Sequence, residues 1–395
     1  MSTLLHRAES FQDELVALRR DLHRHPELAF QELRTAEVAA ARVAALGFEV
    51  SREVGRTGVV AELRNGAGPI VALRADMDAL PIQEANDVPY RSTVPGVMHA
   101  CGHDAHVACL VGAARLLAEA RERGELPTGT VRLLFQPSEE CSDAENKSGA
   151  ARMIEDGAME GVSAVFGLHV GAHLPAGKVY LRAGPIMAGA DVFHATIEGE
   201  SAHAARPNEG TDALVLAAHV VLACQNAVAR RISPMASGVL TIGKIEGGVA
   251  ENVLASRVTL AGTIRYFEDT VREALHRELR RAVAVAETLG GRGTLDLRPG
   301  YPPVVNDATM TDLVAAAVAE TLGADAVAEM EPMMGAEDFA LLQREAPGCF
   351  FWLGAALPQP REHHHPNFDI EERVLPRGAS ALAACAIRAL AEIRP

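Results

Sequence analysis

Residues 98–106 carry one thiol, three imidazoles and one carboxylate within nine positions. Cys101 and His103 lie two positions apart, and side chains at that spacing diverge on a helix, so both can face one metal ion only if the segment is extended or looped. Apolar residues recur at helical spacing just after Asp104, which predicts a helix start. The cluster is therefore predicted to lie on a strand-to-helix loop, where scaffolds often present reactive groups. The alternative interpretation is a buried thiol beside unrelated loop histidines. It is the better explanation for any one of these residues taken alone, but the weaker one for the whole cluster.

Three further segments place metal-binding residue types directly after a short apolar strand. The predicted strands and their polar endings are 70–75 with Asp76 and Asp78, 130–135 with Glu139 and Glu140, and 164–168 with His169. Each ending alone has an ordinary explanation, because aspartates favour turns and adjacent glutamates usually form a solvated pair. Three in succession suggest that these residues share one face of one α/β sheet, at the strand ends where such sheets hold their sites.

The N-terminal part is predicted to contain two helices and then two strands, at 9–22, 33–46, 59–63 and 70–75. The first helix should end before Pro26. Asn65-Gly66 separates the two strands and is a hairpin signal. His23 and His25, at the end of the first helix, would more commonly contact carbonyls and solvent than an active site.

The pattern of predicted elements changes after about residue 186. The predicted elements are strand 191–198, helix 211–231, strands 238–245 and 253–267, helix 268–289 and strand 294–297. The order β-α-β-β-α-β is that of a ferredoxin-like split unit. Because site-like segments resume afterwards, 186–297 is predicted to be inserted into a larger domain formed by 1–185 and 298–395. The expected fold class is α/β, with a mixed sheet flanked by helices and an inserted α+β domain.

The length, composition, net charge and cysteine count exclude several classes of protein. A chain of 395 residues suggests two or three domains, and 48% hydrophobic with 23% charged residues is the balance of a soluble globular protein. A net charge of −15 argues against broad nucleic-acid or anionic-membrane binding. The six cysteines are scattered and predict reduced thiols in a cytoplasmic protein, and the N-terminus lacks an apolar signal core. The longest apolar run, 213–224, is about half a membrane span and is predicted to be a core helix.

The ligand types predict a metal centre. They are one thiol, three imidazoles and one carboxylate: Cys101, His103, Glu140, His169 and His364, the last from a run of three histidines before Pro366. This mixture suits zinc, although manganese, cobalt or nickel could also bind. Five ligands exceed one tetrahedral site, whereas two metal ions about 3.5–4 Å apart would use them all and activate a bridging water. A glutamate beside a ligating glutamate can take the water's proton. Spacing alone leaves open a second possibility, in which Cys101 is a covalent nucleophile.

The chain resembles the aminoacylase and carboxypeptidase family of dinuclear metallohydrolases, in the branch with hippurate hydrolase and plant auxin-conjugate amidohydrolases. The resemblance covers nearly the whole chain. Its motifs are LHRHPELAFQE (22–32), LRADMDALPIQE (73–84), MHACGHDAH (98–106), LLFQPSEE (133–140), GLHV (167–170), SAHAARPNEGTDA (201–213), MGAEDF (334–339) and HHPNFDIEE (364–372).

The resemblance implies a role for each matching residue. Cys101 is expected to be a metal-bridging thiolate, and the other expected ligands are His103, Glu140, His169 and His364, the last chosen from the family's His-X-Pro pattern. Glu139 is expected to be the general base and acid. Asp76 and Asp78 are expected to contact the ligands rather than the metal.

The resemblance also assigns residues to the inserted domain, which it identifies as a lid and dimerisation domain. His203 is expected to polarise the scissile carbonyl, usually from the partner subunit of a homodimer. Asn252 is expected to help hold the substrate carboxylate. One departure is the loop 141–148, which is longer and more charged than the glycine-rich run of relatives and bears on substrate size.

The predicted function is an intracellular, cytoplasmic amidohydrolase that uses two divalent metal ions to cleave N-acyl-L-amino acids. Hippurate-like and N-acetyl compounds are the expected substrates. One alternative is a dipeptidase or carboxypeptidase that cleaves a true peptide bond. Another is a metal- or ligand-binding protein without catalysis, against which the intact Glu139–Glu140 pair argues.

Overall fold

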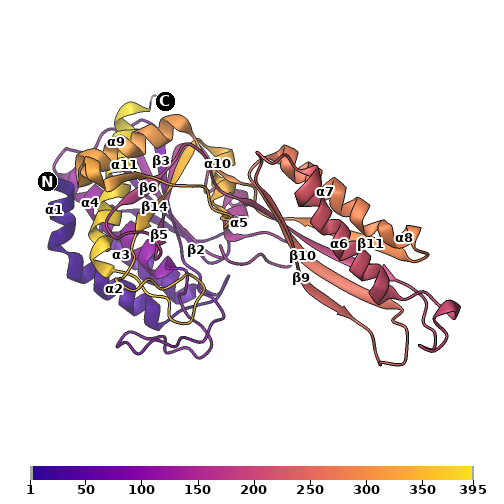
Figure 1. Ribbon diagram of the computed structural model, residues 1–395. Coiled ribbons are helices and arrows are strands. Elements are labelled where there is room, and N and C mark those ends of the chain that lie inside the picture. Colours follow the sequence, from indigo (N-terminus) through magenta and orange to yellow (C-terminus); the bar gives the residue numbers. More distant parts are fainter. Residues whose placement is uncertain (1–2, 394–395) are drawn as a thin grey trace. The chain divides into compact units, whose positions relative to one another are not determined.

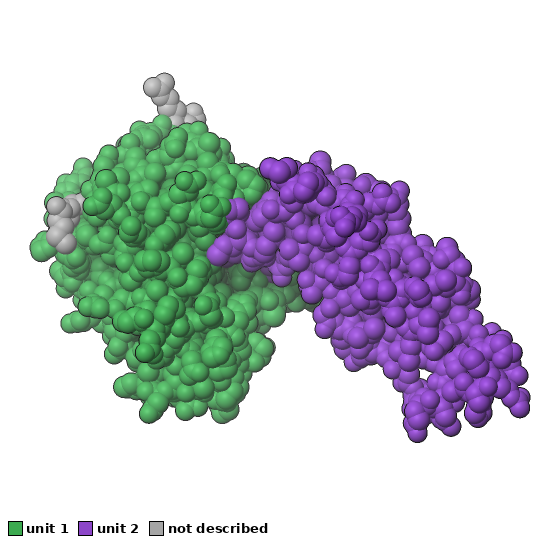
Figure 2. All heavy atoms as spheres, in the orientation of Figure 1, with its two compact units in different colours: residues 1–186, 304–331, 338–395 green, residues 187–303, 332–337 purple. Residues whose placement is uncertain are grey.

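The computed structural model describes residues 3–393, which divide into two compact units (Figure 2). Unit 1 comprises residues 3–186, 304–331 and 338–393, and unit 2 comprises residues 187–303 and 332–337. The predicted α/β class, with a large mixed sheet flanked by helices, is confirmed. The lid and dimerisation role of 186–297 stays a prediction.

Unit 1 is built on an eight-stranded mixed sheet in the order β1-β2-β4-β3-β5-β14-β6-β13. Its strands are β1 (Glu49–Val54), β2 (Gly58–Asn65), β3 (Ile70–Asp76), β4 (Gly129–Gln136), β5 (Val162–Gly171), β6 (Val179–Leu181), β13 (Val327–Glu329) and β14 (Gly348–Gly354). β4, β3, β5 and β14 are adjacent and parallel, so their carboxyl ends meet at one edge. Three of these strands, β3, β4 and β5, carry the polar endings that the sequence indicated.

The predicted hairpin between strands 59–63 and 70–75, which correspond to β2 and β3, is wrong. β2 pairs with β1 and β4, and β3 pairs with β4 and β5, so β4 lies between the two strands that Asn65-Gly66 joins. The turn signal is real, since Gly66 has a φ of +83°. It reverses the chain but cannot show that a strand from more than fifty residues later occupies the intervening position.

Helices cover both faces of this sheet (Figure 1). They are α1 (Thr3–Ser10), α2 (Gln12–Arg24), α3 (Leu33–Ala45), α4 (His103–Glu122), α5 (Gly149–Glu155), α9 (Ala308–Leu322), α10 (Phe339–Glu345) and α11 (Leu375–Glu392). α4 and α11 pack against each other and against β3 and β5. Along β14, Phe351 joins the core on the α4 side, whereas the preceding Phe350 packs on Phe339 of α10 with ring centroids 4.9 Å apart. Successive strand residues point to opposite faces, so α10 covers the second face.

Unit 2 has a four-stranded antiparallel sheet in the order β11-β8-β10-β9. Its elements are β8 (Gly189–Glu198), α6 (Ala213–Arg231), β9 (Gly238–Gly247), β10 (Arg257–Tyr266), α7 (Asp269–Val283), α8 (Val285–Thr288) and β11 (Arg292–Pro299). A separate pair of short strands, β7 (Gly184–Met187) and β12 (Val304–Asn306), lies at the ends of the unit 1 segments that flank unit 2. The long elements follow the order β-α-β-β-α-β, with one helix turn (α8) added before the last strand. α6 and α7 pack on each other and on the sheet.

The prediction of a core helix at 213–224 holds for only one side of α6. Leu216 and Val220 are buried against the sheet, while Leu214, Val215 and Leu222 are 44%, 53% and 67% exposed. By length and composition α6 and the segment Glu372–Glu392 could each cross a membrane, and 78% of the apolar window of the second is buried inside unit 1. That second segment is therefore a core helix of unit 1.

Candidate metal centre

The loop before α4 brings Cys101 and His103 to the carboxyl edge of the sheet. α4 begins at His103, one residue before the predicted start, and Gly102 precedes it with a φ of +95°. Glycine adopts this left-handed conformation readily, and a Cβ atom here would lie 2.4 Å from Cγ2 of Val170. The glycine of the Cys-Gly-His sequence therefore makes the turn that lets both side chains reach one place.

The five predicted ligands form two groups of three that share Cys101. The groups are Cys101, His103 and His169, and Cys101, Glu140 and His364, and within each the potential ligand atoms lie within 4.8 Å of one another. Sγ of Cys101 lies 3.4 Å from Nε2 of His169, and Nε2 of His364 lies 3.2 Å from Oε1 of Glu140. Three other segments of the chain thus converge on the loop that carries the thiol.

The histidine rings present the nitrogen that a metal ion needs. Nδ1 of His103 lies 2.8 Å from the carbonyl oxygen of Asp78, and Nδ1 of His169 lies 2.8 Å from that of Val170. A carbonyl oxygen can only accept, so each Nδ1 is a donor and each Nε2 is the ring nitrogen left to face a metal ion. Nε2 of His103 is buried and has no hydrogen-bond partner among the described residues. Buried polar atoms are normally paired, so this set of thiol, imidazole and carboxylate donors fits a cation of the zinc type.

The charges around the thiol favour a bound cation. Burial, followed by the Glu140 carboxylate, raises the pKa of the Cys101 thiol well above its usual value. Burial would lower the pKa of His103, but nearby carboxylates, led by Asp76, raise it to about 10. Burial and neighbouring histidines lower the pKa of His169. Protons therefore occupy the thiol and one imidazole, and binding of a metal ion would release them.

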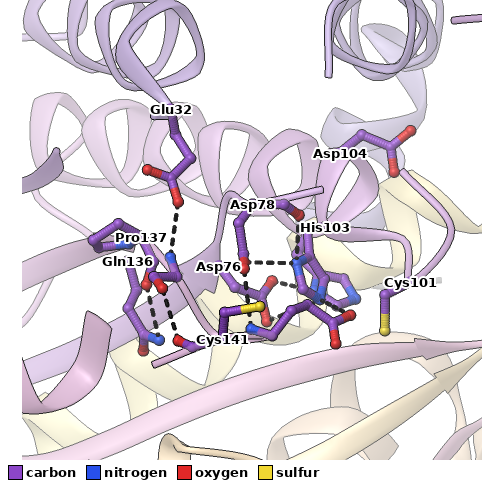
Figure 3. Close-up of polar contacts among 12 residues, drawn as sticks. Glu32, Asp76, Asp78, Cys101, His103, Asp104, Gln136, Pro137 and Cys141 are labelled. Atoms are coloured by element: carbon purple, nitrogen blue, oxygen red, sulfur yellow. Dashed lines mark hydrogen bonds and ion pairs between the residues drawn. The ribbon is translucent and has the colours of Figure 1, made fainter. Parts of the chain in front are cut away.

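Asp78 forms hydrogen bonds with two of the predicted ligands, on the side away from the potential ligand atoms. Its Oδ1 lies 3.2 Å from Nδ1 of His103, and its Oδ2 accepts a 3.0 Å hydrogen bond from the N–H of Glu140. Figure 3 shows Asp78 beside His103, and Asp78 is 1% exposed. Glu139 is also buried and forms a third close group with His103 and Glu140.

Glu32 holds the segment that leads to Glu139, and the sequence analysis missed it. Its Oε1 accepts hydrogen bonds from the N–H groups of Phe30 and Ser138, both at 2.9 Å, and its Oε2 accepts one from the Thr57 hydroxyl at 2.5 Å. Figure 3 shows Glu32 directed at the segment that follows Gln136 and Pro137. Burial raises the pKa of Glu32 to about 7, although the Thr57 hydrogen bond lowers it. Glu32 lies in the motif 22–32, but no local spacing indicates a partner 106 residues away.

Asp76, at the end of β3, has both carboxylate oxygens engaged. Oδ2 lies 2.6 Å from an Nη atom of Arg74, and Oδ1 lies 2.5 Å from Nδ1 of His106. Burial opposes ionisation, but Arg74, followed by His103 and His106, holds the pKa of Asp76 well below its usual value. His106 was not predicted as a site residue, although its spacing of three from His103 on a helix places both on one face.

His23 reaches the same region, contrary to the expectation that it contacts carbonyls and solvent. It is buried, with Nδ1 2.7 Å from Oδ2 of Asp104 and Nε2 3.3 Å from Oε1 of Glu84. Its neighbour His25 does follow the expectation, because its Nδ1 lies 2.8 Å from the carbonyl oxygen of Asp21. His23 therefore holds the residue that follows His103.

Among the three consecutive histidines, only His364 joins a ligand group in the described part of the chain. Its N–H donates to the carbonyl oxygen of Ala100 at 2.8 Å, and its φ of +58° turns it away from its neighbours. Nε2 of His363 accepts from the N–H of Ala172, and Nδ1 of His365 accepts from that of Asn367.

The loop 141–148 is ordered around Asp143. Its Oδ2 accepts from Arg56 and Arg152, and its Oδ1 accepts from the N–H groups of Glu145 and Lys147. The departure from the family's glycine-rich run is thus a charged loop tied to its surroundings by one carboxylate.

His203 and Asn252 belong to unit 2, where they lie on adjacent exposed loops. His203 forms an isolated bridge with Val253, and the N–H of Ala204 donates to the carbonyl oxygen of Asn252 at 3.0 Å. The fold of unit 2 thus brings these two predicted residues together, and their roles in substrate binding stay predictions.

Comparison with known proteins identifies the family. The model of peptidase family M20/M25/M40 matches residues 72–388. An IAA-amino acid hydrolase (ILR1-like 4) of Arabidopsis thaliana is 39% identical over 99% of this chain and 89% of its own length, and an N-acetylcysteine deacetylase of Bacillus subtilis is 38% identical over 98% and 99%. A solved structure of a dinuclear metal-binding M20 peptidase from Bacillus subtilis superimposes with a TM-score of 0.85, 36% identity and coverage of 98% of this chain and 99% of that one.

These similarities span essentially the whole chain. The chain also has two groups of potential metal ligands at the edge of the sheet. The resemblance drawn from the motifs is confirmed. The chain belongs to peptidase family M20/M25/M40 and is a metal-dependent hydrolase.

Proposed function

We propose that this protein hydrolyses the amide bond of N-acyl-L-amino acids, giving a carboxylic acid and a free amino acid. The observation that carries the proposal is the pair of ligand groups sharing Cys101, with Glu139 beside them. The relatives named for IAA-amino acids and N-acetylcysteine support amide substrates of this class.

Two divalent cations are proposed, and the two groups that share Cys101 would hold them. When bound, such ions polarise a carbonyl and lower the pKa of water. Zinc is the preferred candidate because thiolate and imidazole donors suit it, and manganese, cobalt or nickel remain possible occupants. The His364 side chain is 53% exposed, which leaves this side of the centre accessible to a substrate.

Glu139 is proposed to move the proton. Its carboxylate takes a proton from the attacking water, the water oxygen bonds to the amide carbon, and the proton passes to the nitrogen as the carbon–nitrogen bond breaks. Its burial and its place beside His103 and Glu140 support this role. The hydrogen bonds from the N–H groups of Ser138 and Glu140 to Glu32 and Asp78 fix the backbone on either side of Glu139.

Unit 2 is proposed to supply His203 for polarising the carbonyl and Asn252 for holding the substrate carboxylate, with His203 coming from the partner subunit of a homodimer. Two features support a second copy as the partner. β9 is the outermost strand of its sheet, and α6 exposes Leu214, Val215 and Leu222. A cytoplasmic location is proposed because all six cysteines are free.

A substrate panel tests the function. Protein loaded separately with zinc, manganese, cobalt and nickel should hydrolyse hippurate or N-acetyl-amino acids faster than dipeptides. The reverse preference would make the protein a peptidase. The similar solved structure described as an M20 peptidase is the reason to include dipeptides. Failure of metal-loaded protein on every substrate would favour a binding protein without catalysis.

A further inference from the structure

Asp76 is a carboxylate within reach of the metal position that nevertheless has other partners. Its Oδ2 lies 3.6 Å from Nε2 of His103, the atom that faces the metal position, and Asp76, His103 and His106 offer ligand atoms within 4.8 Å of one another. Carboxylates are common zinc ligands. An unrestrained Asp76 would therefore be expected to enter the coordination sphere.

Arg74 restrains one oxygen of this carboxylate. The guanidinium lies 2.6 Å from Oδ2 of Asp76, and its other nitrogens donate to Gln136 at 2.8 Å and to Asp338 at 2.9 Å. All four side chains are buried at 0–1% exposure. Arg74 is thus fixed from three sides and cannot follow Asp76 toward a metal ion.

His106 restrains the other oxygen, and its own hydrogen bonds define its tautomer. The N–H of Val170 donates to Nε2 of His106 at 2.9 Å, so Nε2 is an acceptor and Nδ1 carries the proton that points to Oδ1 of Asp76. Neither ring nitrogen keeps a free lone pair. The group of Asp76, His103 and His106 is therefore not a third metal site.

His106 also contacts both candidate histidine ligands. Its ring centroid lies 5.4 Å from that of His103 and 4.6 Å from that of His169. Its hydrogen bond with Val170 holds β5 directly beside His169. One side chain thus contacts the carboxylate, the helix and the strand that surround the centre.

We propose that His106, together with Arg74, holds Asp76 outside the coordination sphere and thereby keeps the donor set rich in thiolate and imidazole. His106 is then a positioning residue that determines which metal the centre prefers. Without it, Asp76 becomes an additional oxygen ligand, and oxygen-rich sites of higher coordination number favour harder ions such as manganese. The inference rests on the proposed two-metal centre.

Cobalt(II) spectra of the full chain test this, because a cobalt–thiolate site absorbs in the near ultraviolet and its visible bands weaken as the coordination number rises above four. H106Q keeps an acceptor for the Val170 N–H but no longer donates to Asp76 as His106 does. We expect its visible bands to weaken at least twofold and its preference for manganese over zinc to rise about tenfold. The double variant H106Q/D76N should recover the wild-type spectrum and preference.

H106N is the matched control, because its amide can still donate to Asp76 from the position of Nδ1. Folded H106N should keep the wild-type spectrum, and it carries the test if H106Q does not fold. A wild-type spectrum in metal-loaded H106Q, a change that persists in H106Q/D76N, or an altered spectrum in folded H106N would each overturn the inference. Absence of the cobalt–thiolate absorption from the wild-type protein would instead overturn the proposed centre, and this inference with it.

Discussion

The candidate residues of the two units are held in different ways. In unit 1, Cys101, His103 and His169 are buried, and each imidazole is oriented by a backbone carbonyl. In unit 2, His203 and Asn252 are exposed on loops joined by single backbone contacts. Preorganised metal and proton-transfer groups need a rigid scaffold, whereas residues that grip a substrate can lie on loops that adapt to it. Variants of the candidate ligands and their supporting residues in unit 1 should therefore change metal content or stability, whereas variants of His203 and Asn252 in unit 2 should change turnover alone.

The largest effect is expected from Cys101→Ala, because the thiol belongs to both ligand groups. The variant should bind neither ion stoichiometrically, and turnover should fall by more than about 10³-fold, since a metal ion supplies several kcal/mol of transition-state stabilisation. Metal analysis and steady-state kinetics measure both. Cys109→Ala, which removes another buried thiol within α4, is the control that should keep its metal. Two tightly bound ions in Cys101→Ala would contradict the shared-thiol arrangement.

Glu139→Gln should separate proton transfer from metal binding. Turnover should fall by about 10²–10⁴-fold, because a general base contributes that much, while two ions per chain remain bound. The matched variant is Glu140→Gln, which should lose metal as well as activity. Loss of metal from Glu139→Gln would make Glu139 a ligand rather than the base.

His203→Ala should affect turnover without affecting the fold of unit 1. We expect kcat to fall by about 10²–10³-fold, the usual effect of losing one donor to a developing oxyanion. Metal content and urea unfolding followed by Trp352, the only tryptophan of the chain, should not change. His219→Ala replaces another exposed histidine of unit 2 and should have normal kcat. Near-normal turnover in His203→Ala would remove this residue from the mechanism.

The smallest effect is a pH dependence that arises at Glu32. Its pKa of about 7 in the folded state exceeds the ordinary 4.5, so the folded state binds this proton more tightly than the unfolded chain does. The free energy of unfolding therefore loses roughly 3 kcal/mol from this group as pH rises from about 4.5 to 7. Glu32→Gln does not titrate and therefore avoids this loss. As the pH rises from about 4.5 to 7, the free energy of unfolding of the variant should increase relative to that of the wild type. Urea unfolding followed by Trp352 measures the difference at each pH, and a constant difference would refute the assignment.

The short motifs of the sequence indicated most of the candidate ligands that the structure brings together, because their spacing is local, whereas His364 was chosen from the family's His-X-Pro pattern. Cys101-Gly-His103 needs only one glycine turn, and the polar endings of β3, β4 and β5 follow from strand periodicity. The supporting contacts could not be predicted in this way, because Glu32 and Ser138 are 106 residues apart. The pairing of β2 was missed for the same reason, since β4 arrives from a distant part of the chain. The run 213–224 was predicted to be a core helix because it is the longest apolar run, whereas the sheet of unit 2 covers only one side of α6.

The central claim is that two metal ions share one thiol, and Trp352 offers a direct measurement. Its ring stacks on that of His169 with centroids 4.3 Å apart, so cobalt(II) bound at His169 should quench its fluorescence. Metal-free protein titrated with cobalt should bind two equivalents and show a cobalt–thiolate absorption that grows with both. His364→Ala should bind one equivalent with quenching, and His169→Ala should bind one equivalent with little quenching. A single equivalent in the wild-type protein, or two equivalents without thiolate absorption, would contradict the account.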